Sequence, residues 1–281
     1  MKRRNKKLRI PFSYAALSLI GLLMIYPLIW MFFASFKTNR EIFSSISLFP
    51  EKPVFDAFIN GWKGSGQYSY TTFFLNNFKF VIPCVVFSII SSSLVAYGFA
   101  RFRFRLKKIC FAIVIATLML PSSILIIPRY ILFSKFDWLN TYLPIVVPCI
   151  FATESFFIFL LVQFMRGIPY DLDEAARIDG CNSFAILVRI LLPLLKPALF
   201  SVGLFQFMWQ WNDFFNVLIY INSVRKYPLS LALRMSLDVN ANVAWNQVIA
   251  MSFCSIVPVI FIFFFAQKYF VEGISTTGLK G

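Results

Sequence analysis

Long apolar stretches alternate with short polar segments along this chain of 281 residues. A membrane-spanning helix needs about 20 predominantly apolar residues in a row. Windows of that length lie at approximately residues 12–33, 72–99, 109–133, 142–165, 197–221 and 247–266. In lipid a backbone must satisfy its own N–H and C=O groups, so each window is expected to be a helix. The pattern predicts an all-α integral membrane protein with six transmembrane helices in a single transmembrane domain, residues 1–281.

The polar segments between the windows predict a topology. The N-terminal run MKRRNKKLRIP and the connection ARFRFRLKK together carry eleven Lys or Arg and no acid, which is typical of segments kept on the cytoplasmic side of a cell membrane. With six spans, both termini are then expected in the cytoplasm. The outer segments are expected at residues 34–70, 134–141 and 222–246, and the inner ones include the loop 166–196 and the tail 267–281. The first window is too long for a cleavable signal and is expected to remain as a span.

Composition supports a membrane protein and argues against other classes. Hydrophobic residues make up 59 % of the chain and charged residues 14 %, whereas soluble domains have about 25 % charged residues. The formal net charge of +15 lies mostly in the predicted cytoplasmic segments. Each basic residue there adds about 1 kcal/mol of attraction to the anionic leaflet. Membrane lipid is therefore the expected partner of these residues, and nucleic acid is not.

Several kinds of catalytic and metal chemistry have no residues to carry them. The chain has no His, and its five Cys stand singly, without a C-x-x-C pair. A zinc site or a Ser-His-Asp hydrolase would need such residues. A G-x-x-x-x-G-K-[ST] loop for nucleotide phosphates is also absent from the sequence. We expect no catalytic residue, no metal site and no cofactor in this chain, and any energy that the protein uses must come from another protein.

The segment PYDLDEAARIDGCNSFAILVRILLP, residues 169–193, is charged and lies between the fourth and fifth windows. Asp171 and Glu174 have the spacing of a capping box at the start of a helix, and Gly180 is typical of the turn that follows one. Asp173 and Arg177 stand four residues apart and are expected to pair on one side of this helix. The segment predicts a short helix with a marked start and end.

A second helix is expected after the turn. Ser183 is placed to cap an apolar helix over residues 184–192, which ends at Pro193. The predicted unit is therefore a cytoplasmic helix-turn-helix. A helix of about ten residues is marginal in water, so its first helix must pack on another surface. That surface is either a partner protein or the chain's own helical bundle, and the residues alone leave both alternatives open.

The loop carries a resemblance to a known family. The pattern E-A-A, three residues, G, nine residues, I-x-L-P is the signature of the membrane subunits of ATP-binding-cassette (ABC) importers. Its positions are filled here by Glu174, Ala175, Ala176, Gly180, Ile190, Leu192 and Pro193. The chain looks like the carbohydrate-uptake, maltose-type branch, through residues 119–148, WQWNDFF at 209–215 and the end VEGISTTGLKG. The resemblance covers most of the chain and implies a non-enzymatic permease subunit for a sugar or oligosaccharide.

In that family the loop is a coupling helix held in a cleft of a cytoplasmic ATPase subunit. The resemblance implies that the contact with the ATPase is made by Glu174, Ala175, Ala176, Arg177, Asp179 and Gly180. It also implies that Ser275, Thr276 and Thr277 in the tail reach the ATPase dimer, although such a tail is equally typical of a frayed terminus. ATP and Mg would be bound by the ATPase and not by this chain.

The resemblance also implies a set of partners. These are a second permease that forms a heterodimer with this chain, two cytoplasmic ABC ATPase subunits and an extracytoplasmic solute-binding protein. Alternating access is the expected mechanism. The outer segment 222–246 occupies the position of the family's loop that enters the binding protein, and its polar tip contributes Asp238, Asn240 and Asn242.

Polar residues inside the apolar windows are candidates for the transport pathway because they are costly in lipid. The candidates are Glu154, Asn212, Asp213 and Trp211, although such residues often only join helices. Two other functions compete with the permease. A self-contained secondary carrier or channel would need inverted halves or midplane carboxylates, and an intramembrane enzyme would use Glu154 and Asp213. The sequence shows neither inverted halves nor a catalytic motif.

Overall fold

The structure is a computed structural model that describes the backbone of residues 2–64, 67–237 and 243–278 and the side chains of residues 13–64, 67–121, 123–237, 243–265 and 267. Every regular element in this part of the chain is a helix, which confirms the predicted fold class. The chain divides into two compact units, Met1–Thr71 with Ala232–Val257 and Thr72–Leu231 with Pro258–Gly281.

The first unit contains α1 (Lys2–Ala34), α2 (Asn39–Ser44), α3 (Asp56–Lys63) and the start of α15 (Trp245–Gly278). Aromatic rings pack together after the end of α1: the ring of Phe36 lies 5.2–5.4 Å from those of Phe32, Phe55 and Phe58. The hydroxyl groups of Tyr70 and Ser255 are hydrogen-bonded at 2.9 Å. The predicted outer segment 34–70 is thus a packed cap with two short helices.

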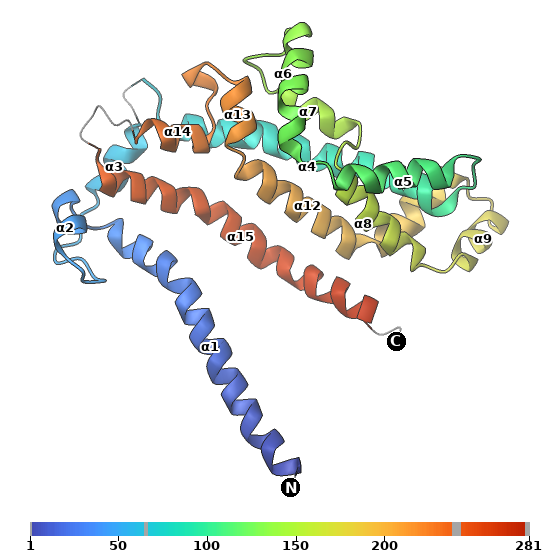
Figure 1. Cartoon of the computed structure of the whole chain (residues 1–281), viewed down its shortest axis with the longest axis horizontal. Coiled ribbons are helices and arrows are strands. Elements are labelled where there is room, and N and C mark those ends of the chain that lie inside the picture. Colours follow the sequence, from blue (N-terminus) through green and yellow to red (C-terminus); the bar gives the residue numbers. More distant parts are fainter. Residues whose placement is uncertain (1, 65–66, 238–242, 279–281) are drawn as a thin grey trace. The chain divides into compact units, whose positions relative to one another are not determined.

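The second unit holds most of the predicted spans and includes the helices labelled α4 to α9, α12 and α13 in Figure 1. Its elements are α4 (Tyr70–Arg101), α5 (Lys107–Leu118), η1 (Ser122–Leu125), α6 (Ile126–Lys135), α7 (Leu143–Ile150), α8 (Ser155–Arg166), α9 (Asp171–Ile178), α10 (Ser183–Ile186), η2 (Leu187–Leu191), α11 (Leu192–Leu194), α12 (Lys196–Trp211), α13 (Phe215–Tyr220), η3 (Val224–Lys226), the start of α14 (Leu229–Met235) and the end of α15.

Four helical stretches in the described residues are long and apolar enough to cross a membrane. They are Ser13–Ala34, Tyr70–Arg101, Leu143–Arg166 and Trp245–Phe265. Two bent pairs raise the number to as many as six if each pair is one span: Lys107–Leu118 with Ser123–Lys135, bent by 96°, and Ser183–Leu194 with Lys196–Trp211, bent by 80°. The structure therefore agrees with a multi-pass membrane protein of four to six spans.

Three predicted spans are not the single helices that the apolar windows indicate. The window 142–165 is broken between α7 and α8. The window 109–133 is broken between α5 and α6, where Pro121 lacks a backbone donor and disfavours a helical residue before it. The window 197–221 is broken at residues 212–214. Asp213 accepts hydrogen bonds from the backbone N–H of Asn216 at 3.1 Å and from its side chain at 2.9 Å, and this arrangement starts a new helix, α13.

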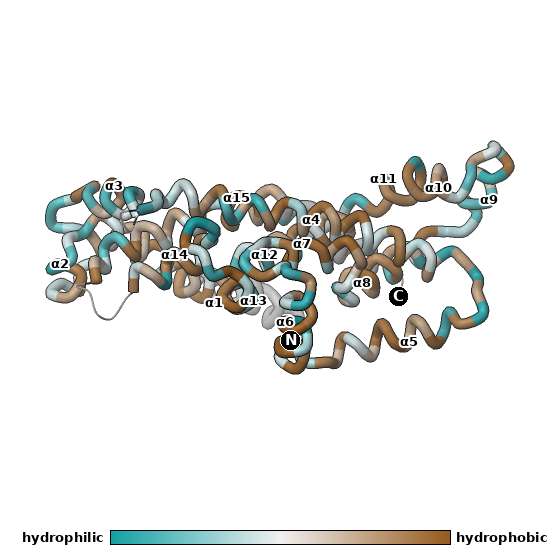
Figure 2. The backbone as a smooth tube through the Cα atoms, turned by 90° about the horizontal axis from the view of Figure 1, so that it is seen from above, coloured by the Kyte–Doolittle hydropathy of each residue, from teal (hydrophilic) through white to brown (hydrophobic). Residues whose placement is uncertain are grey.

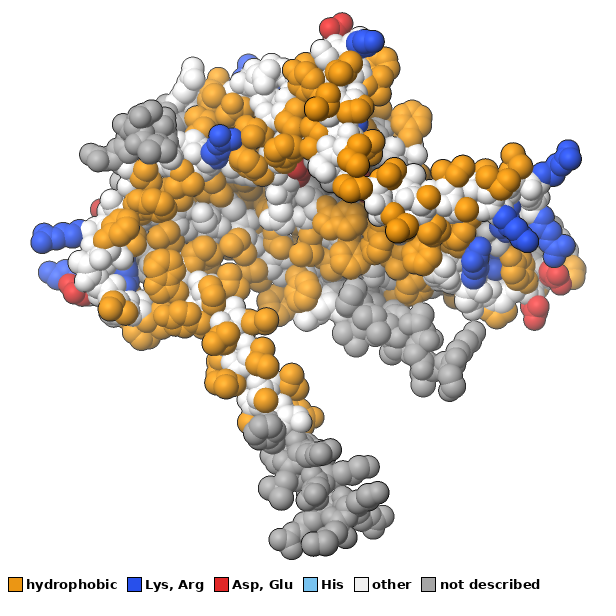
Figure 3. All heavy atoms as spheres, in the orientation of Figure 1, with side chains coloured by type: hydrophobic (Ala, Val, Ile, Leu, Met, Phe, Trp, Pro, Cys, Tyr) orange, Lys and Arg blue, Asp and Glu red, His pale blue; other side chains and the backbone are white. Residues whose placement is uncertain are grey.

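The core of the second unit lies between α4, α8 and the helices from α10 to α12. Its fully buried members include Phe157, Leu161, Met165, Ile186 and Leu191. Figure 2 shows apolar colour along most of α4, α5 and α8, and polar colour at the α4–α5 connection. Figure 3 shows Lys and Arg side chains gathered at the end of this unit that carries α9 and the α4–α5 connection.

Candidate functional site

The loop that carries the E-A-A pattern is a helix with a well-formed C-terminal turn. Gly180 has a φ of +83°, a conformation that favours glycine. The backbone N–H groups of Gly180 and Cys181 donate to the carbonyls of Arg177 and Ala176, at 3.0 and 2.9 Å. This is the Schellman pattern, which satisfies carbonyl groups at a helix end. The predicted turn at Gly180 is present, but Asp171 is the first helical residue and makes no capping hydrogen bond.

The predicted ion pair between Asp173 and Arg177 is wrong. Asp173 instead lies 3.0 Å from Nε of Arg101, the last residue of α4, and their side chains are 2 % and 1 % exposed. The helix turns Asp173 and Ala176, three residues apart, toward the bundle, while Arg177 is exposed. A buried charge needs a partner, and for Asp173 that partner comes from another helix.

Two further contacts hold the start of this loop. Arg101 Nη2 donates to the carbonyl of Ile168 at 3.0 Å, and its guanidinium lies 4.4 Å from the ring centre of Tyr170. The hydroxyl of Tyr170 donates to the carbonyl of Ala100 at 2.6 Å. The sequence prediction missed Arg101 and Tyr170, since neither belongs to the E-A-A pattern.

The face of α9 that points away from the bundle is exposed. Five of the six predicted contact residues are exposed: Glu174, Ala175 and Arg177 on this face, and Asp179 and Gly180 in the turn that follows the helix. Ala176 is buried against the core of the second unit and is not available for a partner. Apolar side chains are also exposed in this loop. Ile178 is 87 % exposed, and Leu172 and Phe184 are exposed as well. Exposed apolar groups at a polar helix are typical of an interaction surface.

The second helix of the loop differs from the predicted one at its start and in its middle. Asn182, not Ser183, is the cap, because the Asn182 side chain accepts a hydrogen bond from the N–H of Ala185 at 2.8 Å. The predicted helix 184–192 consists of α10, a π-helical turn over Leu187–Leu191 and α11. The buried side chains of Ile186, Leu187 and Leu191 hold this segment in the core.

A polar cavity of about 70 Å³ lies in the second unit. It brings two of the predicted pathway residues together, Glu154 at the start of α8 and Asp213 between α12 and α13. Its other lining residues include Arg129, Cys149, Thr153, Gln210, Asn216 and Tyr220. The side-chain oxygen of Gln210 is buried without a hydrogen-bond partner among the described residues. The cavity can therefore offer both donors and acceptors to a hydroxyl-bearing molecule.

The other two predicted pathway residues do not line this cavity. Trp211 is buried and packs on aromatic rings, with ring centres 4.9 Å from Phe78 and 5.1 Å from Phe207. Asn212 is exposed, and its side chain donates to the carbonyl of Met208 at 2.8 Å. Sequence reasoning missed Arg129, Gln210 and Asn216, which reach the cavity from three separate helices.

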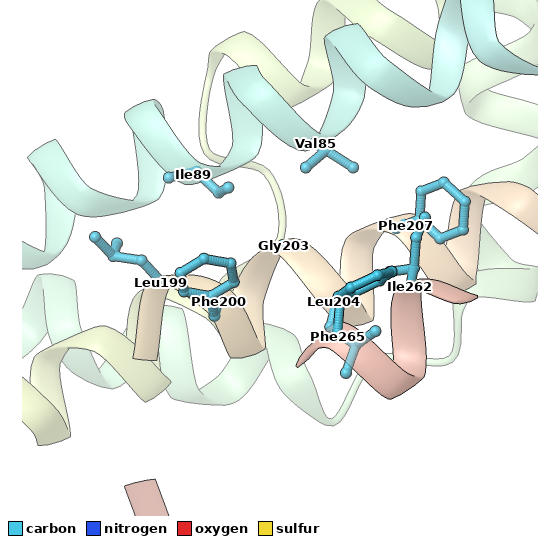
Figure 4. A pocket seen from close by; sticks show the side chains of 9 residues that line it. All are labelled: Val85, Ile89, Leu199, Phe200, Gly203, Leu204, Phe207, Ile262 and Phe265. Carbon is cyan, nitrogen blue, oxygen red and sulfur yellow. The ribbon is translucent and has the colours of Figure 1, made fainter. Parts of the chain in front are cut away.

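A second, apolar pocket of about 400 Å³ is shown in Figure 4. Val85 and Ile89 of α4 line one side, and residues of α12 and α15 line the rest. Gly203 has no side chain to fill this space, and a Cβ there would lie 3.2 Å from Ile89. The lining suits an apolar group, since none of these side chains can form a hydrogen bond.

The remaining predicted site residues lie outside what the structure describes. Asp238, Asn240 and Asn242 fall in the segment 238–242, which is not among the described residues. Ser275, Thr276 and Thr277 belong to the helical backbone of α15, but their side chains are not described. The predicted contacts of both groups therefore stay predictions.

Known proteins resemble this chain over most of its length. Residues 88–276 match the family described as "Binding-protein-dependent transport system inner membrane component". The arabinooligosaccharides transport system permease protein of Halalkalibacterium halodurans is 32 % identical over 284 residues, which is 100 % of each chain. The galactooligosaccharides transport system permease protein of Bacillus subtilis is 28 % identical, over 99 % of this chain and 98 % of that protein.

The fold of this chain is also similar to that of a solved structure. A chain from the crystal structure of a bacterial ABC transporter involved in the import of the acidic polysaccharide alginate has a TM-score of 0.83 and 25 % sequence identity. The similarity covers 95 % of the present chain and 98 % of that chain.

Proposed function

Because this chain belongs to the family of inner-membrane components of binding-protein-dependent transport systems, we propose that it is the permease subunit of an ABC importer for a sugar or oligosaccharide. As a permease component it is not itself an enzyme. It forms the translocation pathway with a second permease as a heterodimer. Two cytoplasmic ATPase subunits, which bind ATP and Mg, supply the energy, and an extracytoplasmic solute-binding protein delivers the cargo.

The exposed face of α9 is the observation that carries this proposal. Glu174 and Ala175 stand on a helix whose opposite face is anchored in the bundle through Asp173 and Ala176. A short helix that is held from behind and exposed in front is suited to dock in a cleft. The small Ala175 allows close approach, Glu174 offers a charged anchor, and Ile178 offers an apolar one.

The cargo class is supported by the named relatives and by the polar cavity. Two relatives are permeases for arabinooligosaccharides and galactooligosaccharides. The cavity contains side chains of the kind that bind sugar hydroxyl groups, with Gln210 as a buried acceptor without a partner and Glu154 and Asp213 as further acceptors. We place the cavity on the transport pathway.

The proposed mechanism is alternating access. When ATP closes the two ATPase subunits, their clefts carry the α9 helices of the two permeases together, and the pathway opens toward the binding protein. The termini face the cytoplasm in this arrangement. The tail with Ser275, Thr276 and Thr277 reaches the ATPase dimer, and the outer segment with Asp238, Asn240 and Asn242 meets the binding protein. Each partner must bind one state more tightly than the other, since equal binding shifts no equilibrium.

The test is reconstitution in proteoliposomes with and without the partner proteins. Arabino- and galacto-oligosaccharides are the probes, and uptake and ATP hydrolysis are the measurements. We expect uptake only when the second permease, the ATPase subunits and the binding protein are all present. Uptake by this chain alone would instead make it a self-contained carrier or channel.

A further inference from the structure

The fourth helix of the structure is attached to the rest of the second unit at both of its ends and in its middle. It runs without a break for 32 residues as α4 (Tyr70–Arg101). Three other predicted spans are interrupted, between α5 and α6, between α7 and α8, and between α12 and α13. Asn76 and Arg101 are 25 residues apart on α4, a distance of about 38 Å at 1.5 Å per residue, which exceeds the roughly 30 Å of a bilayer core.

The inner end of α4 is fixed to both halves of the α9 loop. Arg101 contacts Asp173 and the carbonyl of Ile168 in the first half, at 3.0 Å each. Tyr97, one turn earlier on α4, donates from its hydroxyl to the carbonyl of Ser183 in the second half, at 2.9 Å. A displacement of the loop must therefore displace this end of α4, or break a buried ion pair.

The outer end of α4 is fixed to the base of the outer segment 222–246. The side chain of Asn76, which is 3 % exposed, donates to the carbonyls of Arg225 at 2.7 Å and Tyr227 at 3.0 Å. The same turn is also bonded to the segment between α6 and α7, since Lys226 Nζ donates to the carbonyl of Asn140 at 2.6 Å. The base of the outer segment is thus tied to α4 by the buried side-chain amide of Asn76.

The middle of α4 is joined to the wall of the polar cavity. Ser91 Oγ donates to the carbonyl of Cys149 at 2.7 Å, and Cys84 Sγ donates to the carbonyl of Ile145 at 3.6 Å. Both Ile145 and Cys149 line the cavity. Pro83 removes one backbone donor within α4, but the helix continues through it.

We propose that α4 is the connector of this permease, and that Asn76 and Arg101 are the positioning residues through which it joins the ATPase-binding loop to the base of the outer segment. The proposal rests on the proposed function, because it takes α9 as the ATPase contact. A movement imposed on α9 by the ATPase reaches the cavity wall and residues 222–231 through one rigid helix. Such a route needs direct evidence of coupling between its two ends.

The experiment uses the full complex with its ATPase subunits. It measures the base of the outer segment while the nucleotide state of the ATPase is changed. Hydrogen exchange of residues 222–231 is measured with and without a non-hydrolysable ATP analogue. In the unmodified complex we expect the analogue to change these exchange rates by at least about fivefold, the lower end of common coupling strengths. In Asn76→Leu and in Asp173→Asn we expect that change to be lost while the ATPase subunits still co-purify.

Neighbouring residues provide matched controls. Asn77→Leu changes a buried side chain next to Asn76 whose amide has no hydrogen-bond partner among the described residues, and Asp171→Asn changes an exposed carboxylate on α9. Both should retain the response. Exchanging the two charges, as Arg101→Asp with Asp173→Arg, should restore part of it.

The outcomes separate this proposal from the proposed function. An unchanged response in both Asn76→Leu and Asp173→Asn, or no response in an unmodified complex that binds the analogue, overturns the role of α4. If either variant lowers the thermal midpoint but keeps the change in hydrogen exchange, the substituted residue has only a structural role. That result also overturns the proposed role of α4. Failure of the unmodified chain to co-purify with its ATPase subunits would count against the proposed function instead.

Discussion

Ala175 and Ala176 are neighbours in the E-A-A pattern, but the helix gives them opposite surroundings. Ala175 is exposed on the proposed ATPase-binding face, and Ala176 is buried against the bundle. The pattern therefore combines two requirements of size. One alanine is small so that a partner can approach, and the other is small so that α9 can lie against its own core.

Enlarging each alanine separates these two roles. Ala175→Trp should reduce ATPase co-purification at least about tenfold, which corresponds to about 1.4 kcal/mol of binding free energy, without changing the thermal stability of the isolated chain. Ala176→Leu should lower the stability of the isolated chain, because overpacking a core costs about 1–3 kcal/mol. Pull-down and thermal unfolding in detergent measure the two effects, and Ala175→Ser is the control. Equal effects of the two enlargements on pull-down would contradict the assignment of faces.

The Gly180 turn gives a second prediction for a single residue. Gly180→Ala meets no neighbouring atom within 4 Å, so its cost is conformational: a left-handed φ costs an alanine about 1–2 kcal/mol. We expect faster proteolysis of the α9 loop in this variant. Gly98→Ala is the matched control, because Gly98 also has open space but lies inside α4, where alanine is the better helix former. A loop equally resistant in both variants would argue against a constrained turn.

The breaks within the spans place polar groups where a straight helix would not. Glu154 follows the end of α7, and Asp213 lies in the gap between α12 and α13, so both reach the polar cavity. Neither break contains a proline: α7 continues through Pro148, and the chain turns at Ala152, which has a φ of +52°. The interruptions are therefore part of how the cavity is built.

Removing polar groups from the cavity tests its place on the pathway. Glu154→Leu and Gln210→Leu should each lower sugar uptake about tenfold, the loss expected for one hydrogen bond of about 1.4 kcal/mol, with the ATPase subunits still bound. Asn212→Leu, next to the cavity but not lining it, should retain uptake. If the two cavity variants instead lower complex stability and leave uptake per complex unchanged, these residues join helices and do not line a path.

The distribution of charge over the whole chain predicts its orientation. Basic residues are concentrated at the N-terminus and in the α4–α5 connection, and such residues stay on the cytoplasmic side. In a chain with its native cysteines replaced, Arg103→Cys should react with a membrane-impermeant thiol reagent only after the membrane is opened. Lys52→Cys, exposed in the outer segment, should react in intact cells. The reverse labelling pattern would invert the proposed topology and place α9 on the wrong side for an ATPase.

The family match covers the parts of the molecule on which the proposed function rests. The match covers residues 88–276, which include the polar cavity, the α9 loop and both attachments of α4 to that loop. A permease of this family works as part of an assembly. Its exposed loop and its cavity are therefore best tested in the complete complex.

What the sequence determined by itself was local or compositional. Apolar windows longer than a bilayer predicted membrane helices, basic runs predicted an inner side, and a glycine after a short polar helix predicted the turn at Gly180. These features depend on hydropathy and on backbone preferences, which each segment carries with it. Of the ATPase contacts that the E-A-A resemblance implied, Ala176 is buried, and the contacts of the others stay predictions.

Only the tertiary structure decided which polar groups meet. Asp173 was expected to pair with Arg177 in its own helix, but it pairs with Arg101 because α9 lies against the end of α4. Arg129 joins Glu154 and Asp213 at one cavity although nothing in its local sequence marks it. A buried polar group takes the partner that packing brings to it, and packing between segments far apart in the chain is not encoded in any one of them.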